Sequence, residues 1–143
     1  MKNLISLFAI LAMLSSCKKD EPKRYSEWYV NGERFYTNDV REDIGKVISS
    51  IEGNDFKNKF FLEFNNKPFP TSGQYEIDCS RANQGLTCLG FNYKGVGYSA
   101  PKNTYLQAGS IGGKASYTLN STWFYNESNL QDSVLTKGIF NRP

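Results

Sequence analysis

An Asn-Gly pair joins two β-forming runs in the stretch Trp28-Tyr29-Val30-Asn31-Gly32-Glu33-Arg34-Phe35-Tyr36. Asn and Gly readily take the positive φ angles of a type I′ turn, and this turn has the twist that two antiparallel strands need. The stretch therefore predicts a hairpin with strands over 26–30 and 33–37. It indicates a fold that is built from antiparallel strands.

Several later segments alternate apolar and polar residues with a period of two, which is typical of strands with one buried face. The clearest alternation runs over 73–79. We expect a loop over 94–102, at most one helical turn over 39–44, and turns at 112–113 and 120–121. Further strands are predicted over 46–52, 59–65, 87–93, 103–108, 114–119, 122–127 and 133–140.

These segments predict an all-β fold, either an antiparallel β-sandwich or a small barrel of about eight to nine strands. We expect it to form one domain over 26–143. Aromatic residues make up 15% of the chain. Most of them are expected in the core of this fold, because aromatic side chains suit pleated and half-buried surfaces.

The chain begins with a segment of a different kind. Lys2 precedes an apolar run over 4–14, and charged residues follow from Lys18 onward. A run of this length after a basic residue is typical of a secretory signal, whereas a membrane-spanning helix needs about 20 apolar residues. We therefore expect 1–16 to be a cleaved signal peptide.

The junction Leu14-Ser15-Ser16-Cys17 resembles the lipobox of bacterial lipoproteins. The resemblance implies that the Cys17 thiol receives a diacylglycerol, that cleavage occurs just before it, and that the new amine is acylated. Two or more acyl chains anchor a protein stably, whereas one does so only marginally. Residues 17–25 would then be the lipidated cysteine and a tether reaching about 25 Å. The alternative is an ordinary secretory signal with a cysteine there by chance.

Lys18-Lys19-Asp20-Glu21 follows the cysteine. It is similar to the export signal of Bacteroidetes-type surface lipoproteins, in which a lysine and two acidic residues direct the protein to the outer face of the outer membrane. The resemblance implies an export signal made by Lys19, Asp20 and Glu21 and a surface-exposed, lipid-anchored domain. The alternative is a solvated tether on a periplasm-facing lipoprotein.

Three short motifs of the domain are Trp28-x-Val30-Asn31-Gly32, Ser72-Gly73-x-Tyr75 and Gly138-Ile139-Phe140. Their order is similar to that in small, functionally unassigned lipoproteins of the Bacteroidetes type. The resemblance spans most of the domain and implies a β-sandwich or barrel. It implies no catalytic residues.

Two cysteines, Cys79 and Cys88, remain in the domain after lipidation of Cys17. An even number of cysteines in an oxidising compartment predicts a disulfide across this short loop. Strand alternation, however, places Cys79 on an apolar face and Cys88 on a polar face. A bulge would bring both thiols to one face, and the alternative is a pair of free thiols.

The composition excludes several classes of site. The chain has no histidine, which excludes His-based triads, most zinc sites and the commonest general base. With 17 Lys+Arg against 14 Asp+Glu, it lacks the basic footprint of a nucleic-acid-binding protein. Residues 109–114 lack the spacing of a phosphate-binding loop and indicate a turn. Glu76 and Asp78, with Glu63 on a neighbouring strand, match a solvated polar face better than a catalytic pair. We expect no enzyme, no cofactor and no metal.

Exposed aromatic residues are the best candidates for a binding surface. Trp123, Phe124 and Tyr125 are consecutive on a predicted strand, so their rings must point to both of its faces. We select Trp123, Tyr125 and Trp28 as candidate ligand-binding residues. The alternative is that these rings fill the core.

Asp132-Ser133-Val134 resembles the O-glycosylation acceptor motif of secreted Bacteroidetes-type proteins, with Ser133 as the acceptor. Asn120-Ser121-Thr122 has the form of an N-glycosylation site, but that site belongs to a different machinery.

Taken as a whole, the sequence favours a membrane-anchored lipoprotein that acts as a non-enzymatic binding or accessory module at the cell envelope. Its ligand would be a glycan or a protein. The alternative is a structural or assembly partner of an outer-membrane complex. A row of exposed aromatic side chains would favour glycan binding, and a flat apolar patch of several hundred Å² would favour a protein partner.

Overall fold

The computed structural model describes residues 25–44, 48–53, 58–65, 68–79 and 87–143. The predicted signal peptide over 1–16, Cys17 and the predicted export signal Lys19-Asp20-Glu21 lie outside these residues. Within the described part of the chain, no helix is long and apolar enough to cross a membrane.

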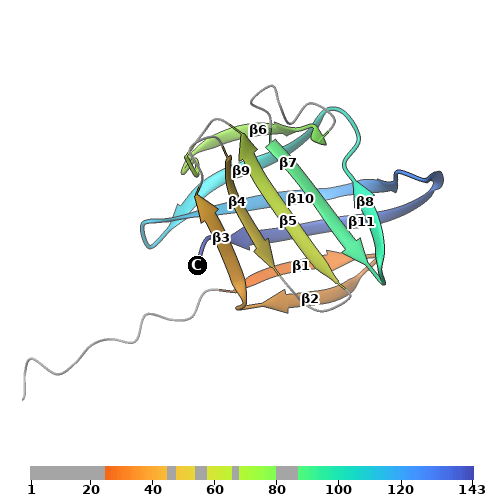
Figure 1. The fold of residues 1–143 in the computed structure, drawn as a ribbon, viewed down its shortest axis with the longest axis horizontal. Helices are drawn as coiled ribbons and strands as arrows, with labels where there is room; N and C mark the ends of the chain where they lie inside the picture. The colour runs from red at the N-terminus through yellow and green to blue at the C-terminus, as the bar shows by residue number, and fades with distance from the viewer. Residues whose placement is uncertain (1–24, 45–47, 54–57, 66–67, 80–86) are drawn as a thin grey trace, which may run out of the picture.

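The fold consists of β-strands, which confirms the all-β prediction, although there are more strands than the sequence indicated (Figure 1). The eleven strands among the described residues are β1 (Ser26–Val30), β2 (Glu33–Thr37), β3 (Val40–Ile44), β4 (Ile48–Gly53), β5 (Lys59–Asn65), β6 (Gly73–Ile77), β7 (Thr87–Tyr93), β8 (Val96–Ser99), β9 (Thr104–Ile111), β10 (Lys114–Asn126) and β11 (Asn129–Asn141).

Five strands close into a small barrel in the order β10, β9, β6, β7 and β8. The short strand β8 closes it, because β8 pairs with both β7 and β10. The β6–β7 pair is parallel, and the other pairs are antiparallel. The sheet is therefore mixed rather than purely antiparallel.

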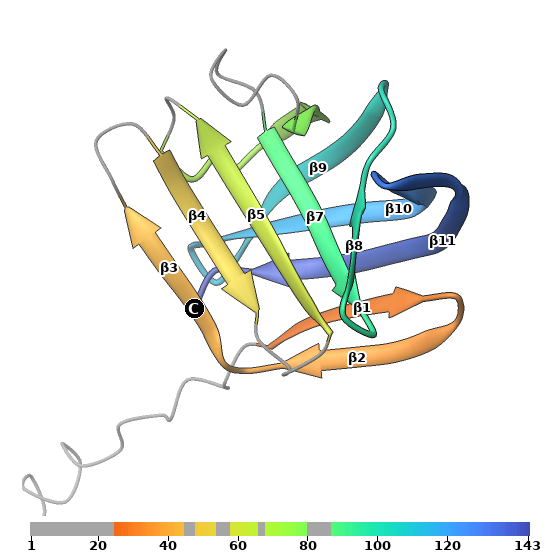
Figure 2. The same cartoon turned by 45° about the vertical axis from the view of Figure 1, so that its right-hand side comes forward.

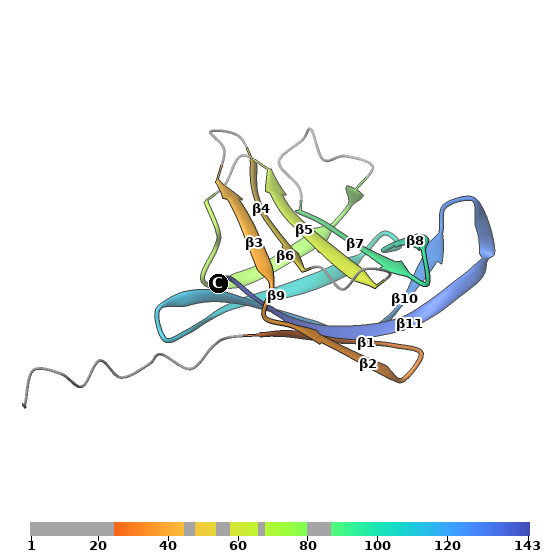
Figure 3. The same cartoon turned by 60° about the horizontal axis from the view of Figure 1, so that its bottom comes forward.

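The remaining strands extend from the barrel as two wings (Figure 2). One wing continues from β10 through β11 and β1 to β2, and the other continues from β7 through β5 and β4 to β3. Figure 3 shows the wings as two layers that face each other. Aromatic rings pack between them: Phe60 of β5 lies 5.2 Å from Trp28 of β1 and 4.7 Å from Phe140 of β11, measured between ring centroids.

The predicted first hairpin is confirmed. Strands β1 and β2 have the predicted bounds, and Asn31 and Gly32 between them have φ angles of 50° and 82°. The predictions over 59–65 and 87–93 are also confirmed as β5 and β7. In each case, local turn chemistry or strict alternation was enough to define the strand.

The helical turn expected over 39–44 is wrong, because this segment is strand β3. It pairs on one side with β4 and carries exposed Arg41, Glu42 and Asp43. Charged side chains are common on edge strands, where they discourage pairing with other chains. They also remove the alternation by which a strand is recognised in a sequence.

Two further predictions are corrected in the C-terminal half. The expected loop over 94–102 contains β8, which follows a two-residue turn at Lys94 and Gly95 with φ angles of 52° and 85°. The expected turn at 120–121 is a β-bulge instead. Strand β10 runs through it without a break, and its pairing with β11 shifts register between Leu119 and Thr122.

Cys79 and Cys88 are joined by a disulfide with a Cα–Cα distance of 4.5 Å. The apparent conflict of faces disappears because β6 ends at Ile77, so strand alternation does not determine the direction of Cys79. Ile77 pairs with Thr87 of the parallel neighbour β7, which brings the two cysteines together.

Candidate functional site

The structure separates the three aromatic residues that were selected from the sequence. Trp28 is completely buried and stacks on Phe35 with ring centroids 5.8 Å apart, so its assignment to a binding surface is wrong. Trp123 is exposed and lies opposite Leu135 on the outer face of β10 and β11. Tyr125 lies two residues farther along β10, is half-buried and lines a separate hollow.

The larger aromatic surface is made by tyrosines that the sequence analysis did not select. Trp28 and Val30 face the core, so Tyr29 between them must face outward. On β2, Phe35 faces the core and Tyr36 faces outward by the same rule. The alternation in the first hairpin predicts that Tyr29 and Tyr36 face outward, once it is known that Trp28 and Phe35 face the core.

A groove of about 620 Å³ crosses the outer face of β1, β11 and β10. Aromatic, aliphatic and polar side chains line it together. The lining residues are Tyr25, Glu27, Tyr29, Ile111, Thr118, Leu119, Asn120, Ser121, Lys137, Gly138, Ile139 and Asn141. We call it the tyrosine groove.

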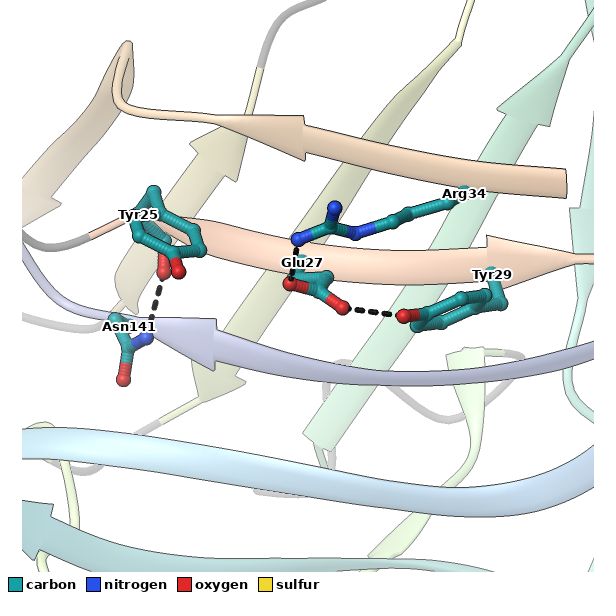
Figure 4. Close-up of polar contacts among 5 residues, drawn as sticks. All are labelled: Tyr25, Glu27, Tyr29, Arg34 and Asn141. Atoms are coloured by element: carbon teal, nitrogen blue, oxygen red, sulfur yellow. Dashed lines mark hydrogen bonds and ion pairs between the residues drawn. The ribbon is translucent and has the colours of Figure 1, made fainter.

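Hydrogen bonds hold the polar side chains of the groove in place (Figure 4). The Tyr29 hydroxyl donates to Oε1 of Glu27 at 2.5 Å, and Arg34 donates to Oε2 of Glu27 at 2.8 Å. Nδ2 of Asn141 donates to the backbone oxygen of Tyr25 at 2.8 Å. Both carboxylate oxygens of Glu27 therefore already have a donor.

These contacts fix the charge states of the network. The hydrogen bond from Arg34, followed by that from Tyr29, lowers the pKa of the Glu27 carboxyl. The same hydrogen bonds raise the pKa of Tyr29 and that of Arg34. At neutral pH, Glu27 is thus an anion, Arg34 a cation and Tyr29 a neutral phenol.

A second hollow of about 480 Å³ continues from the groove onto β2, and Tyr25 lines both. The Tyr25 ring meets the edge of the Tyr36 ring at 6.3 Å between centroids. The Arg34 guanidinium lies 5.5 Å from the Tyr36 ring centroid. An aromatic and polar surface therefore extends across β2, β1, β11 and β10.

Comparison with known proteins does not assign this surface. The chain matches no protein-family model, no curated protein and no solved structure. What the groove can bind is therefore inferred from its own side chains.

The acidic residues considered in the sequence do not form one site. Strand β7 lies between β5, which carries Glu63, and β6, which carries Glu76. Asp78 is buried next to the disulfide, after the end of β6. Among the described residues, no group of three or more His, Cys, Asp or Glu residues is arranged to hold a metal ion. Residues 109–114 form the end of β9, a turn at Gly112 and Gly113, and the start of β10.

Tyr125 lines a separate hollow of about 590 Å³. Its other lining residues are Ile77, Asp78, Cys79, Ser99, Ala100, Pro101, Lys102, Glu127 and Leu130. Ser133 lies opposite Tyr125 on β11 and is half-buried, and its glycosylation stays a prediction.

Proposed function

We propose that the protein is a lipoprotein of the outer membrane, anchored through Cys17, whose β domain binds a glycan at the cell surface without enzymatic activity. The observation that carries this proposal is the row of tyrosines Tyr25, Tyr29 and Tyr36 beside a fixed network of polar groups. The lipobox and export motif support the location. The Cys79–Cys88 disulfide fits an extracytoplasmic compartment.

The chemistry of the groove suits a sugar chain. Sugar rings present apolar C–H faces and a rim of hydroxyl groups. Tyrosine rings offer a flat apolar body with a polar tip, and Glu27, Arg34 and Asn141 offer hydrogen-bonding groups. Because the network at Glu27 is already formed, binding does not have to order these side chains.

The size of the surface favours an oligosaccharide over a single sugar. The tyrosine groove and the hollow on β2 meet at Tyr25, and their volumes are about 620 and 480 Å³. Each has the size of an ordinary small-molecule site. A chain that passes over Tyr25 would occupy both.

A second candidate function is a structural or assembly role in an outer-membrane complex. It is favoured by apolar side chains on the long β10–β11 hairpin, where Trp123 is 49% exposed, Leu135 39% and Leu130 72%. Trp123 and Leu135 are cross-strand partners, so they form one patch. Exposed apolar patches of this kind often mark protein–protein contacts.

Glycan-array binding of the full-length acylated protein in detergent would test the proposal. We expect binding that weakens at least about tenfold when Tyr25 and Tyr36 are replaced by alanine, because two of the three tyrosine rings are lost. Tyr105→Ala is the matched control, since Tyr105 is exposed on β9 and does not line the groove. Wild-type protein that binds no glycan, or a Tyr25/Tyr36 variant that binds as well as wild type, would contradict the proposal.

The location needs its own experiment. Proteinase treatment of intact cells should digest the wild-type protein, and a Cys17→Ala variant should no longer be membrane-bound. Protection of a membrane-bound wild type would instead place the domain on the periplasmic side, and the export role of Lys19, Asp20 and Glu21 would be wrong.

A further inference from the structure

The charged groups of the tyrosine groove are distributed unevenly. On the β2 side of Tyr29, Glu27 forms an ion pair at 2.8 Å with Arg34 of the adjoining hollow, and the two charges neutralise each other. On the other side of Tyr29, Lys137 of β11 lies opposite this residue, and its Nζ is 4.7 Å from the Tyr29 ring centroid. Lys137 makes no ion pair with any carboxylate of the described residues. Lys137 acts on the Glu27 carboxylate through space and lowers its pKa, but Glu27 is already paired with Arg34, so the three groups together carry one net positive charge.

The β-bulge of β10 brings two more polar groups to Lys137. The β10–β11 pairing passes from Leu119 and Gly138 directly to Thr122 and Thr136, so Asn120 and Ser121 together lie opposite Lys137. Both of these side chains are exposed, and both line the groove. Bulges commonly redirect side chains in this way at functional surfaces.

Three hydrogen-bond donors therefore line this part of the groove without an acceptor among the described residues. They are the Lys137 ammonium, the Asn120 amide and the Ser121 hydroxyl, and none of these side chains donates to another described residue. An ammonium on a flexible stem is a compact point charge that can donate hydrogen bonds to an anionic oxygen in several directions. Amide and hydroxyl donors can bind the remaining oxygens of the same anion.

We infer that the part of the groove around Lys137 and the β10 bulge is an anion subsite, and that the ligand is an acidic glycan carrying a carboxylate or sulfate group. The inference rests on the proposed glycan-binding function and adds the charge class of the ligand. The Tyr29 ring holds the Lys137 ammonium through a cation–π contact in the free protein. The acidic group would bind between Lys137 and the bulge, while the sugar rings extend over Tyr25.

Matched pairs of oligosaccharides test this inference. The probes are oligogalacturonates and their methyl esters, and heparan-type oligosaccharides and their desulfated forms, which differ mainly in charge. We expect full-length wild-type protein to bind the acidic member of a pair about fivefold more tightly at low salt. The preference should decrease in 0.5 M NaCl, because exposed charges are screened.

Variants then assign the preference to the subsite. Lys137→Met should remove it, Lys137→Arg should keep most of it, and Asn120→Ala with Ser121→Ala should reduce it with no change in net charge. Lys102→Met is the matched control, because it removes the same charge from an exposed residue that does not line the groove. Thermal unfolding of each variant checks that the domain is still folded.

Each outcome separates this inference from the function on which it rests. Equal binding of acidic and neutral partners, unaffected by Lys137→Met, would overturn the anion subsite and leave glycan binding intact. Binding to neither partner by wild-type protein would overturn both. Binding to vesicles that contain phosphatidylglycerol, in the absence of binding to any acidic glycan, would also overturn it, since the anion would then be a lipid headgroup.

Discussion

Gly138 of β11 lies directly opposite Trp28 of β1, and the space that a side chain at position 138 would need is already filled. A Cβ atom on Gly138 would lie 2.8 Å from the Cβ of Trp28 and 2.9 Å from the backbone oxygen of Glu27. The same atom would lie 2.8 Å from the ring of Phe140. The close approach joins the N-terminal and C-terminal strands of the domain directly beneath the tyrosine groove.

Gly138→Ala should therefore destabilise the domain by about 1–3 kcal/mol, because the added methyl group displaces backbone and core atoms. Urea unfolding monitored by circular dichroism would measure this loss. Gly109→Ala is the matched control, since a Cβ there would meet only the backbone oxygen of Ser116, at 3.8 Å. Equal stability of the two variants would show that β1 and β11 do not approach this closely.

The Cys79–Cys88 disulfide should contribute about 2–3 kcal/mol, because it closes a short loop and restricts the unfolded chain. Thermal unfolding of the wild type should shift to lower temperature in dithiothreitol. A variant with Cys79→Ala and Cys88→Ala should unfold at that lower temperature whether or not the reductant is present. Labelling of free thiols at Cys79 and Cys88 in native protein prepared without reductant would contradict the bond.

Tyr117 should tolerate the loss of its hydroxyl group. It is completely buried, and its hydroxyl has no hydrogen-bond partner among the described residues. Tyr117→Phe removes an unsatisfied polar atom and keeps the ring, so we expect stability equal to or greater than that of wild type. Urea unfolding tests this, with Tyr98→Phe as the contrasting variant, since the Tyr98 hydroxyl donates to Asp132 at 3.0 Å. A large loss of stability in Tyr117→Phe would reveal a partner for this hydroxyl.

The same burial makes the domain sensitive to alkaline pH. Desolvation raises the pKa of Tyr117 far above its ordinary value, because the phenolate cannot be hydrated inside the core. Above about pH 10 the unfolded chain loses this proton while the folded domain keeps it, so the free energy of unfolding falls as pH rises. Urea unfolding between pH 8 and pH 11 should show this fall, and it should be smaller in Tyr117→Phe. An identical fall in both proteins would assign it to other groups.

Local sequence signals predicted the first hairpin well because an Asn-Gly turn determines its own register. Strand β3 could not be predicted in this way, since Arg41, Glu42 and Asp43 show no alternation and the strand depends on pairing with β4. Strand β8 has four residues, and its place is set by β7 and β10. Both strands therefore depend on pairing with other strands, because neither has a clear local signal of its own.

The candidate site was harder to predict than the strands. Alternation shows that Trp28 and Tyr29 point to opposite faces of β1. It does not show which of these faces packs against the wing that contains β5. That face is set by contacts such as the one between Trp28 and Phe60, which come from different wings. The groove also needs Lys137 beside Tyr29, and more than a hundred residues separate these two strand partners.

The two tryptophans offer a direct check of this assignment of faces. Trp28 is 0% exposed and Trp123 is 49% exposed, and the chain has only these two. Trp123→Phe should therefore leave fluorescence emission at shorter wavelength that iodide barely quenches, because the Trp28 indole is shielded by Phe35 and Phe60. Trp28→Tyr should leave emission at longer wavelength that iodide quenches readily, provided that circular dichroism shows a folded domain. If iodide quenched Trp28 as strongly as Trp123, the indole of Trp28 would lie on the outer face of β1 and the tyrosine groove could not exist as described.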